Sequence, residues 1–311
     1  MSISVSKKTQ RIEWLDVAKG IAILLMVGGH SSLPARAQNW IYSFHMPLFF
    51  IASGYATAWV HDSFKSYARK KALGLGRQYL IYSLVIIGLF MLLGLSDGCP
   101  VKLFGGWGDY ALWFVPVLFG ALLLAHLGLN HGCRVKYICF IIFPLISASL
   151  SYFRVQIPWN LGAVPLAAFF VMSGAEARKY SSKIERVTWL SILASLLVMI
   201  VVAEQWHLVM ARNICNPVIL IAAGALAGTL LVAQLSVLIN RYLPRTSSAL
   251  MAIGRETFLI LAFSQLLIIA FNVYLPVNSI VKYLLLVIAL IILKYIKDFI
   301  VEIWKVHLKL K

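Results

Sequence analysis

A lysine and a histidine, Lys19 and His30, lie eleven residues apart in the first long apolar stretch of the chain. Eleven residues at 100° each make three turns and about 20°, so a helix places both side chains on one face, about 16 Å apart. Ionisable side chains inside a bilayer are costly and mark a functional site by default. A histidine titrates near neutral pH and can take a proton from a hydroxyl, as a general base does. The pair therefore indicates chemistry or transport within a membrane.

A second histidine, His45, follows in the next apolar stretch, which should run antiparallel to the first because a short connection joins them. If the first helix starts near Asp16 on the inner side, His30 lies about 21 Å across a core of about 30 Å. His45 then lies at a similar depth. We predict that His30 and His45 are catalytic and face one cavity. The alternative is that each ring binds a local carbonyl or lies at the level of the lipid headgroups.

Basic residues near the inner side could bind an anionic donor. Asp16 and Lys19 are three residues apart and can pair on a helix, and a lysine there could hold phosphate as a point charge. The alternative for Lys19 is a charged anchor that extends to the interface. The stretch from Lys65 to Arg77 is either a positive loop or a clamp for a nucleotide-like donor. The predicted donor-binding residues are therefore Asp16, Lys19, Arg69, Lys70, Lys71 and Arg77.

Aromatic and amide side chains are candidates for binding an acceptor. Trp113 fits an interfacial aromatic belt and equally a platform on which a sugar stacks. Gln265 lies in the middle of an apolar segment, where a buried amide requires hydrogen-bond partners, and it could face a central cavity. We also assign Phe44 and Tyr55 to this set. Ser53-Gly54-Tyr55 and Gly28-Gly29 are small-residue points that allow helices to approach closely.

The composition places the chain among membrane proteins that cross the bilayer several times. It has 311 residues, of which 61% are hydrophobic and 13% charged. The net charge of +17 does not require nucleic acid, because basic residues gather in cytoplasmic loops. No metal-ligand spacing, phosphate-binding loop or dinucleotide motif is present. Of the four cysteines, Cys99 and Cys215 would both face outward and could pair.

Apolar runs bounded by charges, glycine and proline predict an all-α fold with about ten transmembrane helices in a single domain, residues 1–311. With both termini cytoplasmic, 21 of the 28 lysines and arginines lie on the inner side and 5 on the outer side. Residues 298–311 form either an interfacial cytoplasmic helix or an extension of the last span. The predicted spans are 16–33, 40–60, 77–95, 109–128, 135–151, 160–176, 187–204, 214–237, 250–272 and 278–297.

The residues just described resemble a known family. The runs LDVAKGI at 15–21 and SFHMPLFFIASGY at 43–55, with Gly29-His30 between them, resemble the membrane acyltransferase-3 family. The closest branch is the one of fucose 4-O-acetylase-like and surface-polysaccharide O-acetyltransferases. The Arg/Lys-x10-His motif of the family falls on Lys19 and His30. Members often carry Arg-x-x-Arg after the second span, where this chain has Arg69, Lys70 and Lys71, and a late histidine where it has Gln265.

The resemblance implies an O-acyltransferase of the cytoplasmic (inner) membrane. The donor would be acetyl-CoA, as substrate and with no permanently bound cofactor or metal, and the acceptor a carbohydrate hydroxyl at the outer face. His30 would act as base or acyl carrier, a choice that the residues leave open. Two other classes stay open as well: a secondary transporter or lipid-linked sugar flippase, and a non-catalytic membrane scaffold.

Overall fold

Helices account for almost all of the chain that the computed structural model describes, which comprises residues 11–31, 33–59, 63–95, 111–275 and 277–309. Within these ranges there is no strand, only an isolated bridge between Val209 and Ile214. The prediction of an all-α fold is confirmed. The α-helices are α1 (Glu13–Gly29), α2 (Ala35–Ala56), α3 (Phe64–Lys71), α4 (Arg77–Leu92), α6 (Phe114–Asn130), α7 (Cys133–Tyr152), α8 (Val164–Arg178), α9 (Ser181–Glu185), α10 (Trp189–Gln205), α11 (Val218–Tyr242), α12 (Pro244–Arg255), α13 (Thr257–Tyr274) and α14 (Ser279–Lys309).

Four short helical turns join these helices: a π-helical turn over Ala72–Gly76 and 3₁₀ turns over Ala111–Trp113, Pro158–Ala163 and Met210–Arg212. Prolines and glycine fix several of the junctions. Pro217 is the residue just before α11, and Pro244 is the first residue of α12, where no backbone donor is needed. Gly132, with φ of 91°, forms the turn between α6 and α7 that a residue with a side chain would adopt only with strain.

Six helices within the described residues are long and apolar enough to cross a membrane. They are Phe64–Leu92, Ala111–Asn130, Cys133–Tyr152, Pro158–Arg178, Val218–Tyr242 and Thr257–Tyr274. Each of the ten predicted segments contains a helix, but the count of ten spans and the cytoplasmic side of the termini stay predictions. The peripheral helices expose apolar side chains, for example Ile141 on α7 and Leu190 on α10, as a bilayer-facing surface does.

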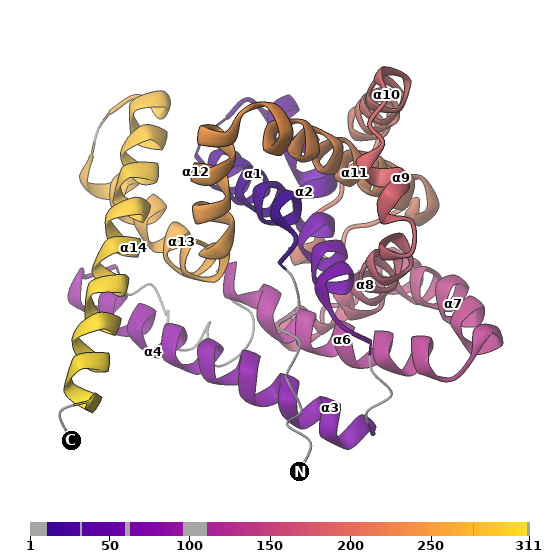
Figure 1. Ribbon diagram of the computed structural model, residues 1–311, viewed down its shortest axis with the longest axis horizontal. Coiled ribbons are helices and arrows are strands. Elements are labelled where there is room, and N and C mark those ends of the chain that lie inside the picture. The colour runs from indigo at the N-terminus through magenta and orange to yellow at the C-terminus, as the bar shows by residue number, and fades with distance from the viewer. Residues whose placement is uncertain (1–10, 32, 60–62, 96–110, 276, 310–311) are drawn as a thin grey trace, which may run out of the picture.

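The helices α1 and α2 form the centre of the molecule (Figure 1). Around them lie α8, α11 and α12, while α14 and α10 lie on opposite sides of the view. The α1 helix is buried along most of its length, including Val17, Ala22 and Val27, none of which has exposed surface. A helix in this position can hold polar side chains away from lipid, which is what Lys19 and His30 require.

Glycines allow the central helices to touch through their backbones. A Cβ on Gly54 of α2 would overlap the carbonyl of Val171 on α8, and one on Gly174 of α8 would overlap the carbonyl of Ile51 on α2. The same reciprocal arrangement joins α1 to α12, where Gly20 lies on the carbonyl of Leu250 and Gly254 on that of Asp16. The predicted close approach at Gly54 is confirmed.

The third and ninth predicted spans need correction. The basic stretch before the third span is helical, because α3, the π turn and α4 form one helix from Phe64 to Leu92. Tyr67 and Leu75 pack on the hydrophobic core, and Ser63 caps the first turn.

The ninth span, 250–272, is divided at Glu256 between α12 and α13. At this break Arg255 forms an ion pair with Asp16 of α1, and Glu256 forms one with Lys297 of α14. Contacts with two different helices therefore fix the break.

The final residues continue α14 without a break to Lys309. Their proposed location at the membrane interface therefore stays a prediction. Cys215 is a free, buried cysteine whose backbone nitrogen donates to Ser151 Oγ. Its suggested partner, Cys99, lies outside the described residues.

We expect Gly254→Ala to lower the free energy of unfolding by about 1–3 kcal/mol, the usual cost of overpacking. The added methyl group would collide with the backbone of Asp16, which a rotamer change cannot relieve. Thermal unfolding of the purified protein in detergent measures this. The matched control is Gly88→Ala on α4, where no atom lies within 4 Å of the new Cβ. Equal stability of the two variants would show that the α1–α12 contact is not required.

Candidate active site

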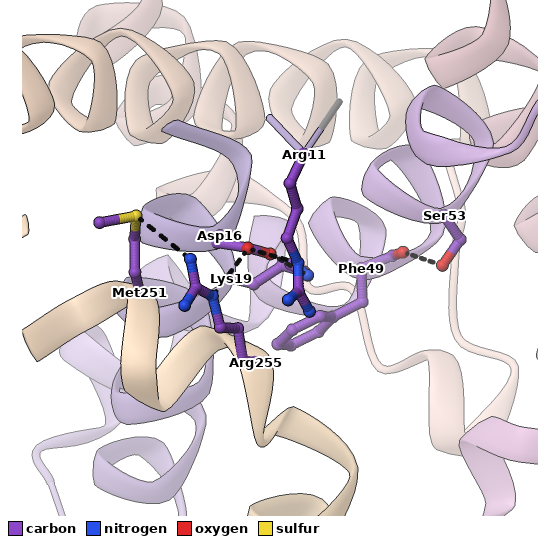
Figure 2. A network of polar contacts seen from close by, with 7 residues as sticks. All are labelled: Arg11, Asp16, Lys19, Phe49, Ser53, Met251 and Arg255. Atoms are coloured by element: carbon purple, nitrogen blue, oxygen red, sulfur yellow. Dashed lines mark hydrogen bonds and ion pairs between the residues drawn. The ribbon is translucent and has the colours of Figure 1, made fainter. Parts of the chain in front are cut away.

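Three cations converge on one buried carboxylate near the start of α1 (Figure 2). Asp16 accepts from Lys19 at 2.6 Å, Arg255 at 3.3 Å and Arg11 at 3.4 Å. The Asp16 side chain is buried, whereas its three partners are partly exposed. One negative charge against three positive charges leaves this cluster with a net positive charge that can attract an anion.

The predicted pairing of Asp16 with Lys19 is therefore present. Asp16 also pairs with Arg255, which the sequence did not suggest. Arg255 reaches Asp16 because its neighbour Gly254 brings α12 against the backbone of α1. The next residue, Glu256, binds Lys297 of α14 instead of its neighbour Arg255. Asp16 thus orients basic side chains, and the cations are the groups that face outward to bind a ligand.

Lys19 also lines a cavity of about 220 Å³, here called the Lys19 cavity. Its walls come from α1, α2, α6 and α13, and include Ser53, Phe49 and Thr257. The Ser53 hydroxyl donates to the Phe49 carbonyl, so it is held along its own helix (Figure 2). The ammonium group of Lys19 is consequently both fixed by Asp16 and accessible to a molecule in this cavity.

His30 and His45 line one cavity of about 90 Å³, which we call the histidine cavity. The structure thus brings together the two residues that the sequence predicted to be neighbours. His30 ends α1 and is exposed, whereas His45 is buried within α2. Trp113 and Gln265 line the same cavity, so four predicted site residues meet there.

Tyr42 lies between the two histidines, and sequence reasoning missed it. Its ring centroid is 5.5 Å from that of His30 and 5.2 Å from that of His45. Its hydroxyl lies 3.2 Å from His30 Nδ1 and 3.4 Å from the carbonyl of Gly29. The only available signal was position, because Tyr42 falls one turn before His45 on α2.

These contacts specify what the rings can do. His45 Nδ1 donates to the carbonyl of Ile41 at 2.9 Å, so its Nε2 is the nitrogen that can accept a proton. When the Tyr42 hydroxyl donates to the Gly29 carbonyl, His30 Nδ1–H must donate to that hydroxyl, and this arrangement leaves His30 Nε2 unprotonated. This is the tautomer that a general base needs.

The basic residues after α2 are divided between two environments. Lys70 and Lys71 line a cavity of about 700 Å³, here called the Lys70 cavity, together with Tyr67 and Gln78. Arg69 and Arg77 are exposed and do not line it. Within the predicted donor-binding set, the structure therefore groups Lys70 and Lys71 around a hollow and leaves the two arginines on the surface.

The three cavities form a series. Ser53, Ala56 and Leu118 line both the Lys70 and the Lys19 cavities, and Leu261 lines both the Lys19 and the histidine cavities. Cavities with shared walls thus lie in the order Lys70, Lys19 and histidine cavity, from the basic end of α3 to the two histidines. A long, thin molecule with an anionic head could occupy this series.

Phe44 and Tyr55 lie away from the histidine cavity. Phe44 is buried against Gly228 of α11. Tyr55 lines an apolar cavity of about 290 Å³ and makes an edge contact with Trp14, with ring centroids 5.2 Å apart. Ten residues separate Tyr55 from His45, about 15 Å along a helix. The structure therefore gives these two aromatic residues packing positions rather than places beside the histidines. Within the described residues, no group of three metal-binding side chains occurs.

The fold and the site define the class of protein: it is an all-helical membrane protein whose titratable side chains line adjoining cavities. A family model described as an acyltransferase domain matches residues 12–297. The chain belongs to this acyltransferase-3 family. Comparison with curated proteins and with solved structures gives no match. The chain is therefore a membrane acyltransferase in general terms.

Proposed function

We propose that the protein is an O-acetyltransferase of the cytoplasmic membrane that moves acetyl from cytoplasmic acetyl-CoA to a hydroxyl of a cell-surface carbohydrate. The observation that carries this is the series of cavities from Lys70 through Lys19 to His30, in a chain of an acyltransferase family. Acetyl-CoA has the matching shape: an anionic nucleotide at one end, a thin arm and a thioester at the other.

The cations would bind the phosphates of the donor. Lys70 and Lys71 would hold the nucleotide in the Lys70 cavity, and Lys19 would hold a phosphate where the thin arm begins. The thioester would then reach the histidine cavity past Leu261. Asp16 keeps Lys19 in place and needs no direct contact with the donor.

His30 and His45 would perform the transfer. His30 Nε2 removes the proton of the acceptor hydroxyl, and the oxygen attacks the thioester carbonyl. The carbon–sulfur bond breaks, the coenzyme leaves as a thiolate, and the proton passes from His30 to the sulfur. In the alternative order, His30 Nε2 attacks the thioester carbonyl and the coenzyme leaves as a thiolate. The acceptor oxygen then attacks the acetyl group, its bond to Nε2 breaks, and the hydroxyl proton passes by way of His45 to the thiolate. His45 assists proton transfer, and Trp113 and Gln265 hold the sugar.

Purified protein in lipid nanodiscs, given radiolabelled acetyl-CoA and a mixture of membrane glycolipid and polysaccharide, tests the proposal. We expect free thiol to appear together with label on the carbohydrate. Acetyl-CoA that binds without release of thiol would favour transport over transfer. Failure of acetyl-CoA to bind at all would contradict the proposed donor.

We further expect Tyr42→Phe to lower kcat/KM by about 2- to 10-fold, the value of one ordinary hydrogen bond. The variant keeps the ring but removes the hydroxyl that holds His30 Nδ1. The control is Tyr283→Phe on α14, whose hydroxyl donates to the carbonyl of Leu24 on α1 at 3.3 Å and which does not line the histidine cavity. If both variants lose the same activity, the Tyr42 hydroxyl has no specific role in orienting His30.

A further inference from the structure

A fifth cavity, of about 650 Å³, adjoins the histidine cavity and has no assigned role. Its walls come from the end of α7, the segment that follows α7, and the loop between α10 and α11. Two arginines, Arg154 and Arg212, line it together with Gln156, Asn160 and Asn213. We call it the Arg212 cavity.

The backbone around this cavity is held in a conformation that side chains disfavour. Within the described residues, the non-glycine residues with positive φ are Arg154, Trp159, Asn160 and Asn213, with values of 53° or 54°. Three of them line the Arg212 cavity. Such conformations cost of order 1 kcal/mol or more each and cluster at binding and catalytic sites. Two of them end helical segments: Val155 N donates to the carbonyl of Leu150 across Arg154 at the end of α7, and Asn213 is the left-handed cap of the Met210–Arg212 turn.

The polar groups of the cavity differ in their partners: the side-chain nitrogen of Gln156 donates to the carbonyl of Arg212 at 3.3 Å, whereas others have no partner in the part of the chain that the structure describes. Asn213 is 9% exposed, and its side-chain nitrogen has no hydrogen-bond partner. Neither Arg154 nor Arg212 forms an ion pair with a carboxylate of the described residues. A buried donor without a partner costs about 1–3 kcal/mol, which a bound acceptor atom would recover.

The cavity also shares part of its wall with the histidine cavity. Ala211 lines both the Arg212 and the histidine cavities. Arg212, the next residue, interacts electrostatically with Tyr42, whose hydroxyl contacts His30. A molecule that fills the Arg212 cavity can therefore extend a neighbouring group toward His30 and His45.

We propose that the Arg212 cavity binds an anionic group, a phosphate or a carboxylate, of the acceptor glycan. This inference rests on the proposed function, because it gives the acceptor its place in the transfer reaction. Guanidinium groups suit this task, since their planar donors match two oxygens of a phosphate or carboxylate at once. The side-chain amide of Asn160, which also lines the cavity, supplies further hydrogen bonds to sugar. The acceptor then carries negative charge next to the sugar whose hydroxyl reaches the histidine cavity.

Isothermal titration of the protein in nanodiscs of zwitterionic lipid tests this without requiring catalysis. Three probes separate the sources of charge: a short-chain prenyl diphosphate sugar, a disaccharide that contains glucuronic acid, and a neutral disaccharide. We expect one anionic probe to bind at least about ten-fold more tightly than the neutral probe, and Arg154→Gln with Arg212→Gln to remove that preference. The probe that binds identifies the charge as phosphate or carboxylate.

The control variant is Arg36→Gln, which removes an exposed arginine that pairs with Glu204 outside this cavity. It should bind the anionic probe as the wild type does. Equal binding of anionic and neutral probes, or unchanged binding by the double variant, would overturn the proposed site. Acetyl-CoA binding is measured on the same samples. If the wild-type protein binds the anionic probe but not acetyl-CoA, that result would contradict the proposed function and leave the anionic site intact.

Discussion

Replacing His30 with alanine is expected to reduce acetyl transfer by about 10²- to 10⁴-fold, the usual contribution of a general base. The change should leave the fold intact, because His30 is exposed at the end of α1. Among the described side chains, its ring contacts that of Tyr42. Steady-state release of thiol from acetyl-CoA, with binding of acetyl-CoA measured separately, checks this. We expect binding to be retained while transfer is lost.

A matched control for His30 is His131→Ala. His131 likewise is an exposed histidine that ends a helix, and its Nδ1 contacts a backbone carbonyl, that of Leu127 at 2.8 Å. It lies outside the histidine cavity. Wild-type activity in His30→Ala, or an equal loss in both variants, would contradict the assignment of His30. Label found on the wild-type protein in the absence of acceptor, and missing from His30→Ala, would identify His30 as an acyl carrier.

Replacing Lys19 with methionine is expected to lower kcat/KM for acetyl-CoA by about 10- to 100-fold. Hydrogen bonds to charged groups contribute about 1.5–3 kcal/mol, and 1.4 kcal/mol is a factor of ten. Methionine keeps the length and packing of the side chain but removes the charge from the Lys19 cavity. Asp16 stays paired with Arg11 and Arg255, so the protein should still fold. Lys19→Arg should retain most of the activity.

The chain contains a close structural copy of this ion pair for comparison. Lys179 binds Glu176 three residues earlier on α8 at 2.8 Å, and Glu176 is also bound by Lys136 of α7. Lys179→Met therefore removes a cation from a similar network that lines none of the three cavities in the proposed donor path. If both lysine variants raise KM for acetyl-CoA equally, Lys19 has no specific role in donor binding.

Several parts of the site followed from local sequence. The spacing of Asp16, Lys19 and His30 on one helix depends only on helical periodicity, and the structure bears out the pairing of Asp16 with Lys19. The shared cavity of His30 and His45 followed from the short connection between α1 and α2, which makes the two helices neighbours. Gln265 was identified as a polar residue in an apolar segment, and it lines that cavity.

Other parts could not be derived in this way. Tyr42 and Arg255 are ordinary interfacial residues in the sequence, and their roles depend on which helix lies opposite them. Phe44 and Tyr55 flank the motif of α2 but point to α11 and to a separate cavity, because side chains on a helix diverge by 100° per residue. The Arg212 cavity joins residues about 60 positions apart, and no local pattern announces it.

The sequence by itself determined that this is an all-helical membrane protein of the acyltransferase-3 family, because apolar length, helical periodicity and a contiguous motif are local properties. Only the tertiary structure decided which side chains meet. Gly254 against Asp16 brings Arg255 to α1, the break at Glu256 separates α12 from α13, and the loop at Ala211 joins two cavities. Each depends on how backbones far apart in the chain pack together, and a helical pattern that is apolar on every side does not specify that packing.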